Sequence, residues 1–403
     1  MKHGWQTKTL GTVCVVDKCQ GVHKSLPYVG LEHIESHTGR FIGSTDPLSV
    51  KSSTFKFSQE HLLYGRLRPY LNKAMLPNFT GHCSTEIFPL KPRPGLSREF
   101  LQYWFLRDAT VEQIDATSTG ARMPRANMNA ILDFEFLLPP LPEQQRIVGI
   151  LDEAFGGIAT AKANAEKNLQ NARALFESHL QSVFTQRGKG WVVKPLSELC
   201  DIKHGFAFKS EFFTSEGDYV LLTPGNFYES GGYRDRGEKQ KYYIGEIPRD
   251  YVLSEGDLLV AMTEQAAGLL GSSVLIPESD KFLHNQRLGL ITKKPGVPWA
   301  NEFFFHVFNT QAVRKEIHDS ASGVKVRHTS PTKIGEVAVS FPTSLAEQRT
   351  IVATLENLRE ETQRLNFLYQ RKLAALDELK KTLLHRAFTG ALQQGACQSV
   401  ECN

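Results

Sequence analysis

The sequence predicts an α+β protein with two similar domains separated by two long helices, which pack as an antiparallel coiled coil with pseudo-twofold symmetry. Three observations lead to this prediction. The run "PEQQRIVGILDEAF" (142–155) returns as "AEQRTIVATLENLR" (346–359). The run "HLQSVFT" (179–185) returns as "LLHRAFT" (383–389) at the same offset of 204 positions (383 − 179). The stretches before the two repeated segments also resemble each other, so the whole chain is an internal repeat.

The two repeated segments are predicted to be long helices. In the second, residues recur every seven positions in two mainly apolar rows, Leu355 to Leu383 and Ile351 to Leu379, which is the a and d pattern of a coiled coil. The same rows of the first segment, 151–179 and 147–175, are richer in alanine. Small residues facing large ones let two helices pack closely, so we expect them to pack on each other. The alternative is that each helix pairs with a helix of another chain.

The segment of chain that connects the two helices predicts whether they run parallel or antiparallel. Forty residues of helix measure about 60 Å, and a parallel pair would require the intervening domain to carry the chain back over that distance. An antiparallel pair needs no such return. The expected boundaries are a first domain at 1–142, a first helix at 143–187, a second domain at 188–345, a second helix at 346–392 and a tail at 393–403.

The two domains repeat more loosely than the helices. "GWQTKTLGTVC" (4–14) aligns with "GWVVKPLSELC" (190–200), "LLYGRLRPY" (62–70) with "LSEGDLLVA" (253–261), and "STGARMPRAN" (118–127) with "ASGVKVRHTS" (321–330). Short β-rich runs alternate with Gly and Pro turns, and helical patterns follow at 98–108 and 301–319. One residue is inserted between Pro342 and Glu347, which predicts a different approach of the chain to the second helix.

The composition is that of an ordinary soluble protein, with 41% hydrophobic and 22% charged residues. No apolar run approaches the ~20 residues of a membrane span, and the N-terminus lacks the apolar core of a signal peptide, so we expect a cytoplasmic protein with no membrane partner. The net charge of +4 mildly favours an anionic partner. No phosphate-binding GxxxxGK[ST] motif or HExxH zinc motif occurs, and "HIESH" (33–37) lacks a third ligand. We therefore expect no cofactor, no metal and no catalysis by this chain alone.

The order of domain, "LPPLPEQQRIVGILDEAF", domain, "LAEQRTIVATLENL" and terminal "LLHRAFTGAL" strongly resembles the specificity subunit of type I restriction-modification systems. The resemblance covers essentially the whole chain. It implies that each domain is a target recognition domain that reads one half of a bipartite, asymmetric site in double-stranded DNA. It also implies that the helices set the gap between the halves and dock two methyltransferase subunits, which restriction subunits join. The alternatives are a coiled-coil scaffold that binds proteins and the specificity chain of a type IIB-like restriction system.

DNA binding needs cations for phosphates and forked or amide side chains for bases. Two basic stretches of the first domain supply them, "GRLRPYLNK" and "STGARMPRAN", with Arg66, Arg68, Tyr70, Asn72, Lys73, Arg122 and Arg125 as candidates. The alternative is that these residues only solvate a surface. In the second domain Lys325 and Arg327 are expected to take the places of Arg122 and Arg125.

Amide side chains distinguish the second domain. Its further candidates for DNA contact are Thr263, Gln265, Asn285, Gln286 and Arg287, although residues of these types also cap turns at strand ends. For docking of a partner at the two helix starts, the candidates are Gln144, Gln145, Arg146, Gln348 and Arg349. Capping and solvation of the first helical turn are the alternative roles of these five side chains.

Overall fold

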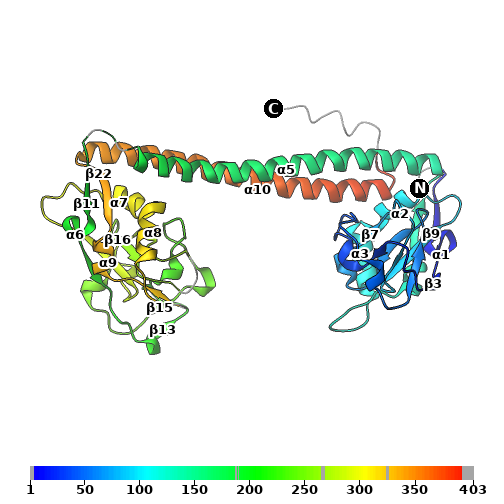
Figure 1. The fold of residues 1–403 in the computed structure, drawn as a ribbon, viewed down its shortest axis with the longest axis horizontal. Coiled ribbons are helices and arrows are strands. Elements are labelled where there is room, and N and C mark those ends of the chain that lie inside the picture. The colour runs from blue at the N-terminus through cyan, green and yellow to red at the C-terminus, as the bar shows by residue number, and fades with distance from the viewer. Residues whose placement is uncertain (1–3, 187, 189, 265–267, 324–325, 393–403) are drawn as a thin grey trace. The chain divides into compact units, whose positions relative to one another are not determined.

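The computed structural model describes residues 4–186, 188, 190–264, 268–323 and 326–392. The chain divides into two compact units, one formed by Met1–Lys167 with Tyr369–Asn403 and the other by Asn168–Leu368. Each unit combines one α+β domain with the parts of both long helices that belong to it (Figure 1). The predicted class of two α+β domains with two long helices is therefore confirmed.

The two long helices, α5 (Leu141–Thr185) and α10 (Leu345–Phe388), run antiparallel. In the first unit the beginning of α5 lies beside the end of α10, because Lys162 forms an ion pair with Asp377 and Arg146 donates to the carbonyl of Leu392 (3.2 Å). In the second unit Phe184, near the end of α5, packs on the same core as Ile351 from the start of α10. The predicted direction is confirmed in both units.

One of the two predicted heptad rows is mostly buried, whereas the other is buried only in part. The buried row consists of Leu151, Ile158, Ala165 and Ala172 on α5 and of Leu355, Thr362 and Leu383 on α10. In the second row Ile147 is buried as predicted (1% exposed), but the prediction is wrong at Leu175, which is 54% exposed, and at Leu379, which is 44% exposed. Two helices share a single stripe of contact, and an α-helix drifts by ~20° per heptad from a strict seven-residue repeat. A row beside the stripe therefore turns toward solvent.

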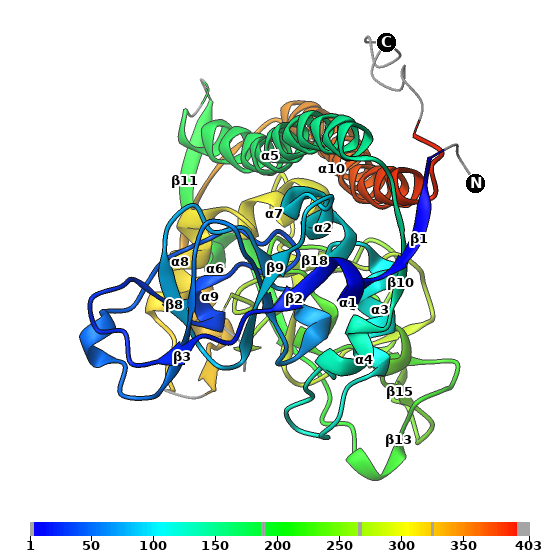
Figure 2. The same cartoon turned by 90° about the vertical axis from the view of Figure 1, so that its right-hand side faces the viewer.

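The first domain contains two four-stranded sheets and a two-stranded ribbon that leads into α5 (Figure 2). The ribbon pairs β1 (Gln6–Thr9) with β10 (Glu135–Leu138). The main sheet has the order β2 (Cys14–Val16), β9 (Ile87–Pro92), β6 (Leu62–Gly65), β7 (Ala74–Met75). The small sheet has the order β3 (Gln20–Gly21), β5 (Thr54–Phe57), β8 (Gly81–Cys83), β4 (Tyr28–Val29).

Short helices complete the first domain: α1 (Leu10–Val13), α2 (Arg98–Phe105), α3 (Asp108–Ala116), α4 (Met128–Leu132) and the 3-10 turns η1 (Leu31–His33), η2 (Pro47–Ser49) and η3 (Pro69–Leu71). Helix α2 begins at Ser97, whose hydroxyl accepts from the amide of Phe100 (3.2 Å) and so caps the helix. The Phe105 side chain on α2 stacks on Tyr64 of β6 with ring centroids 4.6 Å apart. Phe100 contacts Phe388 of α10 (4.7 Å), so the core of the domain continues into the helix pair.

The second domain repeats this plan. Its ribbon pairs β11 (Trp191–Pro195) with β22 (Ala338–Pro342), and its main sheet has the order β12 (Cys200–His204), β20 (Leu288–Lys293), β16 (Leu258–Ala261), β18 (Ser273–Leu275). The small sheet has the order β13 (Phe213–Thr214), β15 (Tyr242–Tyr243), β14 (Val220–Leu221), β19 (Phe282–Leu283), and an extra pair joins β17 (Thr263–Glu264) to β21 (Arg327–His328). The helices are α6 (Leu196–Leu199), α7 (Asn301–Phe308), α8 (Gln311–Asp319) and α9 (Pro331–Gly335), with η4 (Ser210–Phe212), η5 (Pro224–Asn226), η6 (Gly237–Lys239) and η7 (Arg249–Tyr251).

The main sheets of the two domains match strand for strand, whereas the small sheets differ. In the first domain β8, the strand that precedes β9 in the chain, lies between β5 and β4. In the second domain β19, the strand that precedes β20, lies at the edge of the sheet, and β14 lies between it and β15. The structure also corrects the predicted alignment of 62–70 with 253–261. Strand β6 occupies the place of β16, so residues 62–65 correspond to residues 258–261, five positions further along. The residues after these two strands are therefore equivalent, and several candidate side chains lie there.

The helical pattern predicted at 301–319 forms two helices. The chain turns after α7, and the hydroxyl of Thr310 accepts from the amide of Val313 (3.4 Å) to start α8. A residue that caps a new helix stops the previous one, because its backbone leaves the helical conformation. Among the helices that the structure describes, none combines the length and the apolar character that a membrane span requires.

Candidate nucleic-acid interface

The first domain brings its two predicted basic stretches together. Leu67, just after β6, forms an antiparallel bridge with Arg125. The amide of Arg68 donates to the carbonyl of Pro124 (2.7 Å), and the amide of Ala126 donates to the carbonyl of Arg66 (2.9 Å). A second bridge joins Arg125 to Thr119 and closes the 119–125 loop on itself. Residues 66–68 and 119–126 thus form one small surface, which we call the loop cluster of the first domain.

A carboxylate that the sequence did not reveal organises the arginines of this cluster. Arg66 donates from Nε to Oε2 of Glu86 (3.0 Å). Arg125 donates from Nε to Oε1 (3.0 Å) and Oε2 (3.1 Å) of the same carboxylate, with its Nη2 3.0 Å from Oε1. Burial works to raise the pKa of Glu86, but hydrogen bonds from Arg125 and Arg66 outweigh it, and the pKa is lowered. Glu86 is therefore a charged bridge between two cations.

Three further candidates are exposed on or beside the cluster. Arg68 and Arg122 are exposed, and Tyr70 is exposed by 46%. Arg68 adopts a left-handed backbone (φ 52°), which is uncommon for a residue with a side chain. Its backbone thus lies in a tight turn at the start of η3. A cation on a fixed turn suits contact with a phosphate.

The structure corrects the prediction for Asn72 and Lys73. Asn72 is only 2% exposed, so its amide does not lie on the surface where base edges could reach it. Lys73 donates from Nζ to the carbonyl of Leu31 (2.6 Å), and burial lowers its pKa. Both residues follow the η3 turn toward the interior of the domain. The sequence could not distinguish this direction from an outward one.

The second domain builds a similar cluster at the equivalent place. Thr263 pairs with His328 in the β17–β21 ribbon, and their side chains lie 3.2 Å apart. The amide of Met262 donates to the carbonyl of Arg287 (3.0 Å), which joins residues 285–287 to the ribbon. Residues 262–264, 285–287 and 327–328 form what we call the loop cluster of the second domain. The predicted Gln265 and Lys325 lie outside the described residues.

The candidate side chains in this second cluster differ in exposure. Gln286 and Arg287 are exposed, whereas Thr263 and Asn285 are mostly buried. The Asn285 side chain accepts from the amide of Arg287 (3.1 Å), which is the turn-capping role that the sequence left open. Arg327 donates from Nη1 to the ring of His318 (2.7 Å to Nδ1). Gln286 and Arg287 are therefore the candidates best placed to meet a ligand.

Backbone hydrogen bonds show which residues of the two clusters are equivalent. The bond from the amide of Arg66 to Glu86 (2.9 Å) matches that from Met262 to Arg287 (3.0 Å). The bridges of Arg125 to Leu67 and Thr119 match those of His328 to Thr263 and Ser322. The predicted pairing of Arg125 with Arg327 is thus wrong by one position. One framework carries Arg66, Glu86 and Arg125 in the first domain and Met262, Arg287 and His328 in the second.

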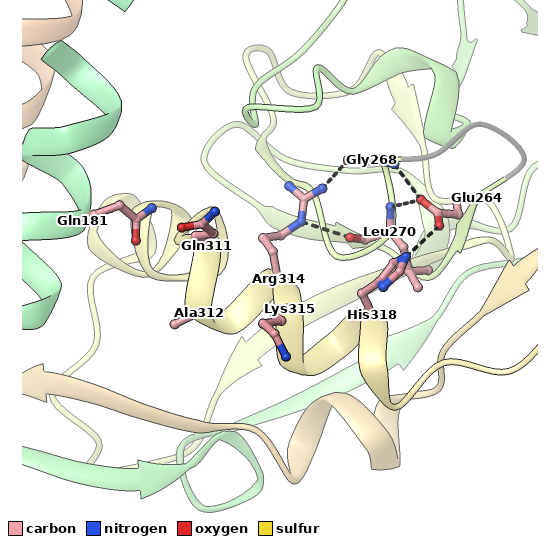
Figure 3. Close-up of a pocket in the computed structure, with 9 residues that line it drawn as sticks. All are labelled: Gln181, Glu264, Gly268, Leu270, Gln311, Ala312, Arg314, Lys315 and His318. Atoms are coloured by element: carbon pink, nitrogen blue, oxygen red, sulfur yellow. Dashed lines mark hydrogen bonds and ion pairs between the residues drawn. The ribbon is translucent and has the colours of Figure 1, made fainter. Parts of the chain in front are cut away.

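A buried carboxylate also supports the second cluster (Figure 3). Glu264 is 4% exposed, and its Oε2 accepts from the amides of Gly268 (3.1 Å), Leu269 (3.1 Å) and Leu270 (2.9 Å). Arg314 donates to the carbonyl of Leu270 (2.9 Å), and the His318 ring lies 3.7 Å from Glu264. A cavity of about 500 Å³ is lined by Glu264, Gly268, Leu270, Arg314 and His318, among others. Glu264 therefore fixes the backbone of residues 268–270.

At the two helix starts, the predicted partner-binding glutamines have a different role. Gln144 and Gln348 are each 0% exposed. Gln144 accepts from the amide of Ser97 (2.8 Å) and donates to the carbonyls of Gly95 and Pro139 (2.8 Å each). Buried polar groups with matching partners hold elements together, so this side chain fixes α5 to its domain. It is not available to a partner.

Gln348 makes the equivalent bonds in the second unit. It accepts from the amide of Ala300 (3.0 Å) and donates to the carbonyls of Pro298 and Pro342 (2.9 Å each). The residue inserted before α10 therefore leaves this anchor unchanged. Gln145 and Arg349 remain exposed. Arg146 pairs with Glu143 (2.6 Å), and that hydrogen bond raises its pKa.

Within the described residues no group of three or more His, Cys, Asp or Glu side chains could hold a metal ion. The site chemistry is that of charged, amide and aromatic side chains on two equivalent loop clusters. Such groups bind by charge and hydrogen bonding, and the framework beneath them is repeated. The fold and these clusters define a duplicated two-domain protein with an equivalent loop cluster in each domain.

The chain belongs to the family described as the type I restriction modification DNA specificity domain, whose family model matches residues 2–169 and again residues 188–370. Two curated relatives come from Escherichia coli. The type I restriction enzyme EcoDI specificity subunit is 29% identical over 160 residues, 39% of this chain and 35% of the relative. The EcoBI specificity subunit is 25% identical over 236 residues, 58% of this chain and 44% of the relative. The matched parts span less than half of either relative.

Two solved structures are similar in fold. A chain from work on complex assembly and conformational transition of the type I R-M system has a TM-score of 0.80 at 20% identity, covering 97% of this chain and 99% of that one. The HsdS subunit from Thermoanaerobacter tengcongensis has a TM-score of 0.66 at 20% identity, covering 97% and 98%. The duplicated architecture is therefore also found in other proteins.

Proposed function

We propose that this chain is the noncatalytic DNA-recognition subunit of a type I restriction-modification complex, acting in the cytoplasm. Each domain reads one half of a bipartite, asymmetric site in double-stranded DNA. The two long helices set the distance between the halves and dock two methyltransferase subunits, and restriction subunits complete the complex. The proposed boundaries are 1–142 and 188–345 for the recognition domains, 143–187 and 346–392 for the helices, and 393–403 for a tail.

The observation that carries this proposal is the shared framework of the two loop clusters. The same backbone bonds place Glu86 in the first domain and Arg287 in the second. A repeated framework with different side chains presents two different surfaces in the same way. Two like domains with unlike surfaces are what a reader of two unlike DNA half-sites requires.

The exposed side chains of the clusters suit DNA. Arginine can donate two hydrogen bonds to guanine O6 and N7, and glutamine can pair with adenine N6 and N7. The proposed contacts to bases and phosphates are Arg66, Arg68, Tyr70, Arg122, Gln286 and Arg287. Arg125 supports the first cluster through Glu86. The proposed contacts do not include Asn72, Lys73, Thr263 and Asn285, because these side chains are buried or bonded inside the chain.

The helix starts suit a methyltransferase docked once per unit. Gln144 and Gln348 are buried and so cannot contact a partner. The proposed contacts to the methyltransferase subunits are therefore Gln145, Arg146 and Arg349. Arg349 lines a cavity of about 760 Å³ together with Trp299 and Asn301 at the start of α7. Because Gln348 fixes α10 to this same place, a partner that fills the cavity would contact the helix and the domain at once.

Salt dependence tests the proposal against a protein-binding scaffold. The chain, purified with a cognate methyltransferase subunit, is titrated with duplex DNA between 50 and 200 mM salt. A recognition subunit that contacts 6–10 phosphates loses roughly 10³- to 10⁵-fold in affinity over this range. Absence of duplex binding at low salt would favour the scaffold. Duplex binding alone does not distinguish a type IIB-like system, which differs from the proposal only in its partner subunits. The absence of a separate restriction subunit from the complex would favour that alternative.

A further inference from the structure

Arg66 and Arg125 both donate hydrogen bonds to Glu86, but they do so with different sets of nitrogen atoms. A guanidinium carries five N–H donors in a fixed plane. Arg125 uses Nε and Nη2 on Glu86, and its Nη1 lies 3.4 Å from the carbonyl of Met123. Both of its nitrogen edges thus face the protein. Arg125 is a brace that ties the 119–125 loop to the start of β9.

Arg66 is held in a different way. Among the described residues it donates only from Nε, to Oε2 of Glu86 (3.0 Å). The guanidinium carbon also lies 5.4 Å from the centre of the Phe88 ring, so the plane of the group is supported from one side. The edge formed by Nη1 and Nη2 has no protein acceptor there. That edge is the one that binds the O6 and N7 atoms of guanine end-on.

We propose that Glu86 is a positioning residue that fixes Arg66 so that its Nη1–Nη2 edge reads a guanine in the half-site of the first domain. This inference rests on the proposed DNA-recognition function and deepens it. Glu86 itself accepts no bond from the base. It acts by removing the rotational freedom of the Arg66 side chain, which otherwise has to be lost when DNA binds.

The second domain strengthens the argument, because the same framework lacks this device. Arg287 stands where Glu86 stands in the first domain, and Met262 and His328 stand where Arg66 and Arg125 do. At this position of the framework, therefore, only the first domain has an arginine that a carboxylate supports. A guanine read by an arginine that a carboxylate holds in place should accordingly belong to the first half-site only.

The test uses the complex with its methyltransferase and a pool of duplexes in which the first half-site is randomised and the second is fixed. For the unchanged protein we expect one guanine to be preferred by about 5- to 150-fold, the discrimination of a good bidentate pair. Arg66→Lys keeps the charge but lacks the fork. Affinity for duplexes with the other three bases should therefore persist, while affinity for the guanine duplex falls to theirs and the preference approaches onefold. Arg66→Lys leaves the Glu86–Arg125 brace in place, so it does not depend on how Glu86 variants fold.

Glu86→Gln should lower the preference at the same base pair at least fivefold, and Glu86→Asp should restore part of it. The matched control is Glu60→Gln, which breaks the Glu60–Lys91 ion pair (2.7 Å) near the other end of strand β9. This control should leave every base preference unchanged.

Two results would overturn the inference while the proposed function stands. One is a bipartite motif whose guanine preference survives Arg66→Lys. The other is an equal loss of affinity for all four bases in Glu86→Gln, which is the signature of a structural brace. If the unchanged protein selects no motif at all, both the inference and the proposed function are wrong.

Discussion

Gln144 and Gln348, 204 positions apart (348 − 144), make the same three hydrogen bonds at the starts of α5 and α10. Each amide joins the beginning of a long helix to the beginning of a shorter one, α2 or α7, and to the end of the strand that precedes it. Three elements are therefore fixed to one another by a single side chain. This accounts for the repeat of the glutamine in the sequence without any contact to a partner.

Replacing Gln144 by methionine should destabilise the first unit by about 3 kcal/mol. The volume is kept, but the amide of Ser97 and the carbonyls of Gly95 and Pro139 lose their partner, and a buried unsatisfied group costs about 1–3 kcal/mol. Amide hydrogen exchange of α2 measures the loss. Gln348→Met should have the same effect on α7. As a control, Gln145→Ala at the exposed neighbour should change the stability of either unit by less than about 0.5 kcal/mol. Equal effects of Gln144→Met, Gln348→Met and Gln145→Ala would contradict the anchoring role of the two buried glutamines.

Glu264→Gln should loosen residues 268–270. The carboxylate accepts three backbone amides at once, and hydrogen bonds to a charged group contribute about 1.5–3 kcal/mol each in comparable settings. A neutral glutamine keeps one acceptor oxygen but places an NH₂ group in the same space. We expect amide exchange at Gly268 and Leu270 to accelerate at least tenfold. Glu255→Gln, an exposed acid of the same domain, serves as the control.

His284 predicts how the second domain responds to acid. Burial, partly opposed by a hydrogen bond from Nε2 to the carbonyl of Leu288 (2.9 Å), lowers its pKa to about 4. The unfolded chain has a histidine pKa near 6.5. Between these values the unfolded state binds a proton that the folded state does not, so stability falls as the pH falls from about 6.5 to 4.

The loss should reach about 2 kcal/mol at pH 5 relative to pH 7.5. Urea unfolding at the two pH values, read by amide exchange in β20, measures it. His284→Gln removes the titrating group, so this share of the acid sensitivity should disappear whatever the variant costs at pH 7.5. An imidazole that titrates near pH 6.5 by NMR would contradict the prediction.

The proposed role of the helices predicts the effect of shortening them. Lys162 faces Asp377, so the heptads centred on these two residues, 159–165 of α5 and 374–380 of α10, lie opposite each other within the first unit. Deleting both heptads keeps the buried row in register and shortens each helix by about 10 Å. The gap between half-sites should shrink by about three base pairs, since ten base pairs span about 34 Å. Deletion of the α5 heptad alone mismatches the row, and we expect it to abolish binding.

The sequence predicted what depends on periodicity and on repeats. The long helices, their direction and the duplication followed from the offset of 204 and from the rows of apolar residues. Even so, Leu175 and Leu379 were assigned to a buried row, because a heptad pattern does not say how wide the contact stripe is. The two-helix region at 301–319 was taken as one helix because Thr310, its second cap, has no distinctive sequence context.

The candidate sites were harder to predict because they depend on contacts between distant residues. Glu86 contacts Arg66 across 20 positions and Arg125 across 39, and no local pattern marks it. Gln144, Asn72 and Arg68 are polar residues on short turns or helix starts, where sequence does not tell inward from outward. The five-residue error between β6 and β16 hid the equivalence of Glu86 and Arg287. An alignment anchored on the strands themselves could have revealed it.

The central claim is that two domains on one framework read two different half-sites. The most direct measurement is the selection of bound sequences from a random duplex pool, with the chain purified together with its methyltransferase partner. The account predicts two short, different motifs at one fixed spacing, with a guanine in the motif whose preference is lost in Arg66→Lys. A single contiguous motif, two identical motifs, or no motif would contradict it.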